Sequence, residues 1–145
     1  MTLLLAIDPG NCTGFAWFRG DELLECGVTT VDAPTMSLRP DRLVVELPQV
    51  YDAAHSKGDP NDLIGVAVQV GRWVERYRGL ESIRLVKPAT WKGQVPKEIH
   101  HGRILRKLAL REQGVMPSLP KTKAHNMLDA VGLGMWALGR MDRGI

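Results

Sequence analysis

Cysteine and long apolar runs are both scarce in this 145-residue sequence. The two cysteines, Cys12 and Cys26, form neither a metal-ligand spacing nor a disulfide framework. No apolar run approaches the roughly 20 residues of a membrane span. The apolar start, Met1–Ala6, lacks the basic residues of a signal peptide, and Asp8 soon interrupts it. We therefore expect a thiol-reduced, cytoplasmic protein with no membrane partner.

Net charge is also low, because 19 basic residues nearly balance 16 acidic ones. With 44% hydrophobic residues, this balance excludes intrinsic disorder, and the length predicts a single domain over residues 1–145. The charge is nevertheless uneven, since residues 84–123 hold ten basic and two acidic side chains. Such a stretch is typical either of a surface that binds a polyanion or of a solvated helix face.

Short apolar segments separated by turn residues dominate the first half of the chain. They predict strands over residues 3–8, 14–19, 23–30, 42–47 and 82–86. Helices are expected from Asn61 or Asp62 to Tyr77, over 97–111, and from Thr122 to about Arg140. The middle helix should turn its apolar residues inward, namely Ile99, Ile104, Leu105 and Leu108. This order predicts an α/β fold, with a five-stranded mixed sheet of three antiparallel and then two parallel strands flanked by helices.

Two carboxylates stand at the ends of predicted strands. Asp8 ends the first strand, and Glu46 lies near the end of the fourth. If those strands are neighbours, the two side chains lie side by side, where they repel each other unless a cation intervenes. Mg²⁺ prefers oxygen ligands and would remove the conflict. The alternative is that Asp8 simply caps the turn at Asp8-Pro9-Gly10.

The last predicted helix offers a third acidic group. His125 and Asp129 are four residues apart, and Asn126 and Asp129 three apart, so both pairs share a helix face. Together with Asp8 and Glu46, Asp129 and either His125 or Asn126 would suffice to hold two metal ions ~4 Å apart, which can clamp a phosphodiester. In the plainer interpretation, Asp129 only complements the helix dipole and His125 is exposed.

The segment Ile7-Asp8-Pro9-Gly10, followed by Thr13-Gly14, closely resembles the opening of the RuvC family of Holliday junction resolvases. Val44-Val45-Glu46 is similar to that family's second acidic motif, and Asp129-Ala130-Val131 to its closing helix. The segment from Pro88 to Lys97 resembles its lysine segment, most of all in phage-type members.

The resemblance implies an RNase H-like fold and a metal-dependent endonuclease that cuts branched DNA. Asp8, Glu46 and Asp129 would bind Mg²⁺, for which Mn²⁺ would substitute, with two ions in each site. The family's remaining ligand is an Asp or His about one turn before the last Asp. Here Asn126 stands three residues before Asp129 and His125 four, so the fourth ligand is either one. His125 would ligate a metal or move protons.

The expected partner is branched DNA, held through backbone phosphates by Lys92, Lys97, Arg103 and Lys107. These residues would otherwise serve only solubility. Trp91 and Tyr51 are candidates for stacking on an unpaired base, although packing is the commoner role of such residues. Two symmetric nicks in one junction require two active sites, so the resemblance also implies a homodimer with twofold symmetry.

Other interpretations of the same residues stay open. The pattern from Asp8 to Gly14 also fits the phosphate loop of actin-like and sugar-kinase ATPases, but those proteins need two such domains. The YqgF type of RNase H-like protein, linked to ribosomal RNA maturation, shares the first motif and the compact size. A third possibility is a catalytically inactive nucleic-acid-binding module.

Overall fold

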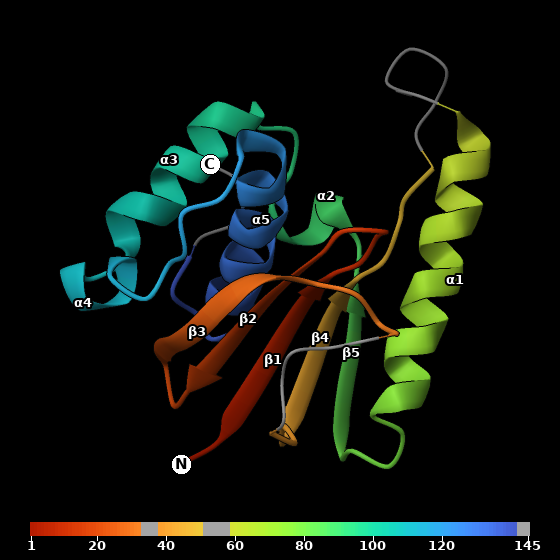
Figure 1. Cartoon of the computed structure of the whole chain (residues 1–145), viewed down its shortest axis with the longest axis horizontal. Coiled ribbons are helices and arrows are strands. Elements are labelled where there is room, and N and C mark those ends of the chain that lie inside the picture. The colour runs from red at the N-terminus through yellow and green to blue at the C-terminus, as the bar shows by residue number, and fades with distance from the viewer. Residues whose placement is uncertain (33–37, 51–58, 142–145) are drawn as a thin grey trace.

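A five-stranded mixed sheet forms the centre of the computed structural model, which describes residues 1–32, 38–50 and 59–141 (Figure 1). The strand order is β3-β2-β1-β4-β5. The antiparallel part consists of β1 (Leu3–Asp8), β2 (Thr13–Arg19) and β3 (Glu22–Thr29). Strand β4 (Arg42–Glu46) runs parallel to β1, and β5 (Ser82–Val86) runs parallel to β4. The predicted fold class is confirmed, and the condition that the first and fourth strands are neighbours is met.

Helices cover both faces of this sheet. One face packs against α1 (Pro60–Arg76), and the other against α5 (Lys121–Ala137), with α3 (Lys97–Lys107) beyond it (Figure 1). Two short helices, α2 (Pro88–Trp91) and α4 (Leu110–Gln113), complete the described elements. None of the helices in the described residues is long and apolar enough to cross a membrane. Helix α1 begins earlier than expected, because Asp59 caps it and Pro60 starts it in place of Asn61 or Asp62.

The side chains of β1 alternate between two cores. Leu4 and Ala6 belong to the core beneath α5, whereas Leu5 and Ile7 belong to the core beneath α1. Because successive residues of a strand point to opposite faces, the next residue on the α5 side is Asp8. The alternation therefore places the first predicted carboxylate on the face that α5 covers.

The middle helix differs from the prediction of one helix over 97–111. It ends at Lys107, the backbone is extended at Leu108, and α4 begins at Leu110. Its buried residues are His100, His101 and Ile104, whereas Ile99 is 49% exposed and Leu105 is 38% exposed. The apolar pattern was right for Ile104 and Leu108, which are buried, and wrong for Ile99 and Leu105. Helix α3 instead turns His101 towards a buried hydrogen-bond partner on α5, which satisfies both polar groups.

Helix α5 lies unusually close to the sheet. A side chain at Gly14 of β2 would overlap the backbone of Asn126, and one at Gly134 would overlap the ring of Phe18. Gly132 similarly accommodates Ile104 and Trp91. Because these three positions lack side chains, nine consecutive residues of α5, from Met127 to Met135, are buried. The close approach holds the amino-terminal half of α5 beside the end of β1, where Gly14 pairs with Asp8.

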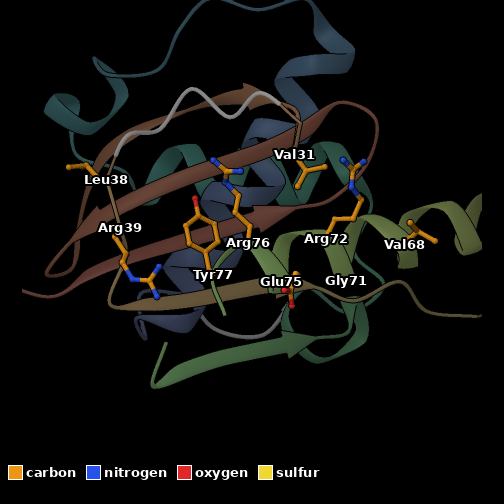
Figure 2. Close-up of a pocket in the computed structure, with 9 residues that line it drawn as sticks. All are labelled: Val31, Leu38, Arg39, Val68, Gly71, Arg72, Glu75, Arg76 and Tyr77. Atoms are coloured by element: carbon orange, nitrogen blue, oxygen red, sulfur yellow. The ribbon is translucent and has the colours of Figure 1, made fainter. Parts of the chain in front are cut away.

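A hollow of about 830 Å³ lies beside α1, on the other side of the sheet from α5 (Figure 2). Its lining is Val31, Leu38, Arg39, Val68, Gly71, Arg72, Glu75, Arg76 and Tyr77. At least two of its three arginines have partners. Arg72 pairs with Asp32, and Arg39 donates a hydrogen bond to the carbonyl of Arg78. None of the residues predicted to carry chemistry lines this hollow.

A buried ion pair fixes α4 against the rest of the molecule. Glu112 accepts hydrogen bonds from the guanidinium of Arg140 at 2.7 and 2.8 Å, and from the backbone amides of Leu23 and Ala109 at 2.7 and 3.0 Å. Burial alone would raise the pKa of Glu112, but the hydrogen bonds from Arg140 and the two amides lower it to about 2. One carboxylate thereby joins β3, α4 and the end of α5.

We predict that Glu112→Gln destabilises the protein by about 3 kcal/mol at pH 7, because it leaves Arg140 without its charged partner. The lowered pKa means that this contribution is complete above about pH 5 and is lost as the pH falls toward 2. Urea unfolding at several pH values measures the difference. Glu22→Gln, which removes an exposed ion pair with Arg111, is the control and should change stability by less than about 1 kcal/mol. An effect of Glu112→Gln that does not vary with pH would contradict this assignment.

Candidate active site

Asp8 and Glu46 meet at one edge of the sheet. Ile7 of β1 is in register with Val45 of β4, and the strands are parallel, so the next residue on each strand is an acidic one. Val44 lies in the core beneath α5. Because side chains alternate between the two faces along a strand, Glu46 lies on the same face as Val44, and Asp8 lies on that face too. The two carboxylates therefore lie on neighbouring strands beneath one helix, as the sequence predicted they would if these strands were adjacent.

Asp129 comes to the same place from α5. Its side chain is only 6% exposed, and it lies within the electrostatic range of both strand carboxylates. Asp129 Oδ1 lies 2.8 Å from His101 Nε2, and Asp129 Oδ2 lies 3.8 Å from Lys97 Nζ and 4.0 Å from Lys92 Nζ. The structure thus brings together the three acidic residues that the sequence singled out, which come from β1, β4 and α5.

The three carboxyl groups differ in their electrostatics. Burial, followed by the negative charges of Glu46 and Asp129, raises the pKa of Asp8 well above its ordinary value. Burial also raises the pKa of Glu46, although Lys92 partly offsets this effect. Burial alone would raise the pKa of Asp129, but the hydrogen bond with His101 and the nearby lysines lower it instead. Asp8 is therefore the carboxyl group whose negative charge is least compensated by the chain.

Helix α2 supplies two of the groups that hold Glu46. Pro88 starts this helix directly after β5, and the sequence analysis did not predict it. Trp91 Nε1 donates to Glu46 Oε2 at 2.7 Å, and Lys92 Nζ lies 3.5 Å from the same oxygen. The indole of Trp91 is buried, so the structure supports the packing role of this residue over base stacking. Tyr51, the other stacking candidate, lies outside the described residues.

The sequence analysis missed His101. This side chain is buried on α3 and contacts Asp129, and its ring centroid lies 5.0 Å from that of His125. The imidazole that is hydrogen-bonded to Asp129 thus comes from α3 and from neither of the predicted positions, His125 and Asn126. The spacing in the sequence could have indicated that His101 is buried, because it precedes Ile104 by three residues and so shares its buried helix face.

His125 and Asn126 lie half-buried on the first turns of α5, next to this cluster. Burial, and then the positive charges of His101, Lys97 and Lys121, lower the pKa of His125. A lowered pKa keeps its imidazole neutral near pH 7, the form that accepts a proton or binds a metal ion. The backbone of Asn126 faces Gly14, so this residue also marks the closest approach of α5 to β2.

The four predicted phosphate contacts do not form one group. Lys92 lies among the carboxylates, and Lys97 lies at their rim with a side chain that is 52% exposed. Arg103 is half-buried further along α3. Lys107 is exposed at the other end of that helix, about 15 Å from Lys97 along its axis. Lys121 was not among the predicted contacts, but its charge reaches His125, so it adds to the positive rim.

The donor chemistry of this cluster suits a hard divalent cation. Three carboxylates on one face supply the oxygen ligands that Mg²⁺ and Mn²⁺ prefer, and burial together with the negative charges of Glu46 and Asp129 raises the pKa of Asp8. Within the part of the chain that the structure describes, no group of three or more His, Cys, Asp or Glu side chains is arranged so that it could hold a metal ion. Lys92 pairs with two of the carboxylates there, so the cluster already contains one positive charge.

Comparison with known proteins identifies the fold. No family model matches the sequence, and no curated protein sequence matches it. Among solved structures, T. thermophilus RuvC in complex with Holliday junction substrate superposes with a TM-score of 0.64 and 16% identity, over 96% of this chain and 94% of that chain. A further Thermus thermophilus RuvC structure gives a TM-score of 0.56, also at 16% identity, over 94% of this chain and 93% of that chain. The chain therefore has the RuvC-like, RNase H-like fold that its motifs predicted.

We predict that Trp91→Phe destabilises the protein by about 1–2 kcal/mol more than Trp17→Phe does. Both indoles are 1% exposed, so each substitution removes a similar buried volume. Only Trp91 Nε1 donates to a carboxylate, whereas Trp17 Nε1 has no hydrogen-bond partner among the described residues. Denaturant unfolding at pH 7 measures both variants. Equal losses would show that the contact between Trp91 and Glu46 contributes nothing to stability.

Proposed function

We propose that this protein is a metal-dependent, structure-selective endonuclease that cuts branched DNA in the manner of a Holliday junction resolvase. The observation that carries the proposal is the meeting of Asp8, Glu46 and Asp129 on one face of a RuvC-like fold. Lysines at the rim of the same site supply the positive charge that a polyanionic substrate requires. A structural neighbour that was solved with a Holliday junction substrate is consistent with this choice of DNA.

The metal would be Mg²⁺, with Mn²⁺ as a substitute, and two ions would occupy each site. Asp8, Glu46 and Asp129 would hold them, with His125 or Asn126 as the fourth ligand, and His101, which contacts Asp129, is a further donor beside the cluster. When bound, such ions polarise a phosphodiester and lower the pKa of a water molecule. The carboxylate cluster favours this chemistry, because divalent cations would offset both the burial of Asp8 and its repulsion by Glu46 and Asp129, which together raise its pKa.

The residues of the chain itself have separate tasks in this proposal. Trp91 and Lys92 orient Glu46, and His101 orients Asp129. The backbone of Asp8 is held by its pairing with Gly14 of β2, directly after the pair of Ile7 with Val45 of β4. His125, neutral and half-buried at the edge, is placed to accept a proton from a water molecule near the phosphate. Lys97 and Lys121 neutralise the DNA backbone outside the cluster.

The same proposal includes a homodimer, because two symmetric nicks in a four-way junction require two active sites. The mass of the protein in solution tests this part directly. Cleavage assays on a labelled four-way junction, an RNA hairpin and a linear duplex test the choice of substrate. Preferential cutting of the junction supports the proposal, and preferential cutting of RNA would favour the YqgF-like alternative.

We predict that Asp8→Asn abolishes cutting of a four-way junction in Mg²⁺ or Mn²⁺ while junction binding persists. The substitution removes a buried charge that Glu46 and Asp129 oppose, so the metal-free variant should be at least as stable as the wild type. Cleavage gels, gel-shift titration and thermal unfolding measure the three quantities. Parallel loss of binding and of stability would instead make Asp8 a structural turn residue.

We predict that Lys97→Ala weakens junction binding and lowers the slope of log K against log salt concentration by about one unit. Its ammonium group is half-exposed at the rim, where a phosphate can reach it. Arg19→Ala is the control, because it removes one exposed positive charge at the opposite edge of the sheet, beside Leu3. The control should leave the slope unchanged. An unaltered slope in Lys97→Ala would remove Lys97 from the phosphate contacts.

A further inference from the structure

Lys92 occupies an unusual position for a lysine on a basic surface. Its Nζ lies 3.5 Å from Glu46 Oε2 and 4.0 Å from Asp129 Oδ2, and its charge also acts on Asp8. The side chain is 23% exposed, less than half the value for Lys97. The ammonium lies 5.2 Å from the centre of the Trp91 ring, which supplies a further attraction. One cation thus lies among all three acidic residues.

This placement satisfies a physical need of the chain without metal. Three carboxylates on one face repel each other, and removing a carboxylate from water is costly unless a positive charge is close. Among the described residues, Lys97 pairs with Asp129 and not with Glu46, and it is more exposed, so Lys92 is the ammonium that serves both Glu46 and Asp129. A lysine suits this task because its charge is compact and its four-carbon stem is flexible.

We propose that Lys92 is a resident cation that holds the carboxylate cluster together in the metal-free protein and is displaced when a divalent ion binds. The inference rests on the proposed function, because it assumes that Asp8, Glu46 and Asp129 bind the metal. An ammonium and a divalent cation compete for the same carboxylate oxygens, so occupation by one disfavours the other. Metal affinity is therefore set partly by the contacts of Lys92 that must be broken.

The displacement has a consequence for the surface of the site. Because Lys92 follows the last residue of α2, its stem can swing without moving a long helix. Once released from Glu46, its ammonium joins Lys97 at the rim, where a phosphate of the substrate would approach. Metal loading would thus increase the positive charge available to DNA, and the metal-free protein would hold part of that charge inside the cluster.

Amine labelling of the wild-type protein tests the displacement directly. Lysines are acylated briefly with acetic anhydride at increasing Mn²⁺ concentrations, and the modification of Lys92 is quantified by mass spectrometry. Displacement predicts at least a roughly threefold increase in the labelling rate of Lys92 at saturating Mn²⁺, with Lys107 unchanged as an exposed internal control. A rate that stays constant or falls as Mn²⁺ binds overturns the proposal.

The variant Lys92→Met tests the competition. Its metal-free form should melt roughly 5–10 °C below the wild type, because two buried carboxylates lose their shared partner. Calorimetric titration should show Mn²⁺ binding about tenfold more tightly, and saturating Mn²⁺ should restore most of the lost melting temperature. Lys107→Met removes the same charge at the far end of α3 and should alter neither quantity. If Lys92→Met fails to fold even with Mn²⁺, Lys92→Gln carries the same comparison.

The outcomes separate this inference from the proposed function. Equal or weaker Mn²⁺ affinity in Lys92→Met, beside normal binding by the wild type, overturns the role of Lys92 and leaves the metal site standing. Absence of Mn²⁺ binding in both proteins, together with no cleavage of the junction, overturns the proposed function and this inference with it. Tighter Mn²⁺ binding by Lys92→Met, together with faster labelling of Lys92 in the wild type, supports both the proposed function and this inference.

Discussion

Repulsion among three buried carboxylates is the constraint around which this structure is arranged. Asp8, Glu46 and Asp129 converge from three elements, and burial, followed by their mutual repulsion, raises the pKa of Asp8. Nothing in a β-α sandwich requires acidic groups at this edge, so their presence must be compensated locally. Trp91 and Lys92 hold Glu46, and His101 holds Asp129. The short helix α2 and helix α3 supply these contacts as well as apolar residues of the core.

Close packing of α5 is the second part of this arrangement. Gly14 lies in register with Asp8 and also admits the backbone of Asn126, so a single position joins the strand end to the helix that carries Asp129. Thr13, beside it, donates to the carbonyl of Gly10 and approaches the indole of Trp73 on α1. The Thr13-Gly14 pair thus fixes the turn after Asp8 from both faces of the sheet. The segment from Asp8 to Gly14 therefore has a structural role as well as a chemical one.

The sequence predicted most of the fold and the three acidic residues, but not the groups that hold them. Strands and their order follow from local apolar patterns, and Asp8, Glu46 and Asp129 stood out because charge is unexpected among apolar neighbours. His101 gave no such signal, since its role depends on the rotation of α3 about its axis. That rotation is fixed by a partner 28 residues away, and it exposes Ile99 and Leu105 against the local pattern. Similarly, the contact of Trp91 with Glu46 spans 45 residues, so local sequence could not distinguish stacking from packing.

The acidic cluster lowers the stability of the metal-free protein, and this cost bears on its function. A module that only bound nucleic acid would gain stability by replacing Asp8 with a neutral residue, and it would lose unfavourable negative charge near the phosphates. The chain instead keeps the carboxylate and surrounds its neighbours with an indole, an imidazole and an ammonium, each of which lowers the pKa of Glu46 or Asp129 against the effect of burial. Groups that reduce stability while being held in a defined geometry are characteristic of sites that bind metal ions or carry out reactions. The arrangement therefore favours the proposed catalytic role over that of a passive binding module.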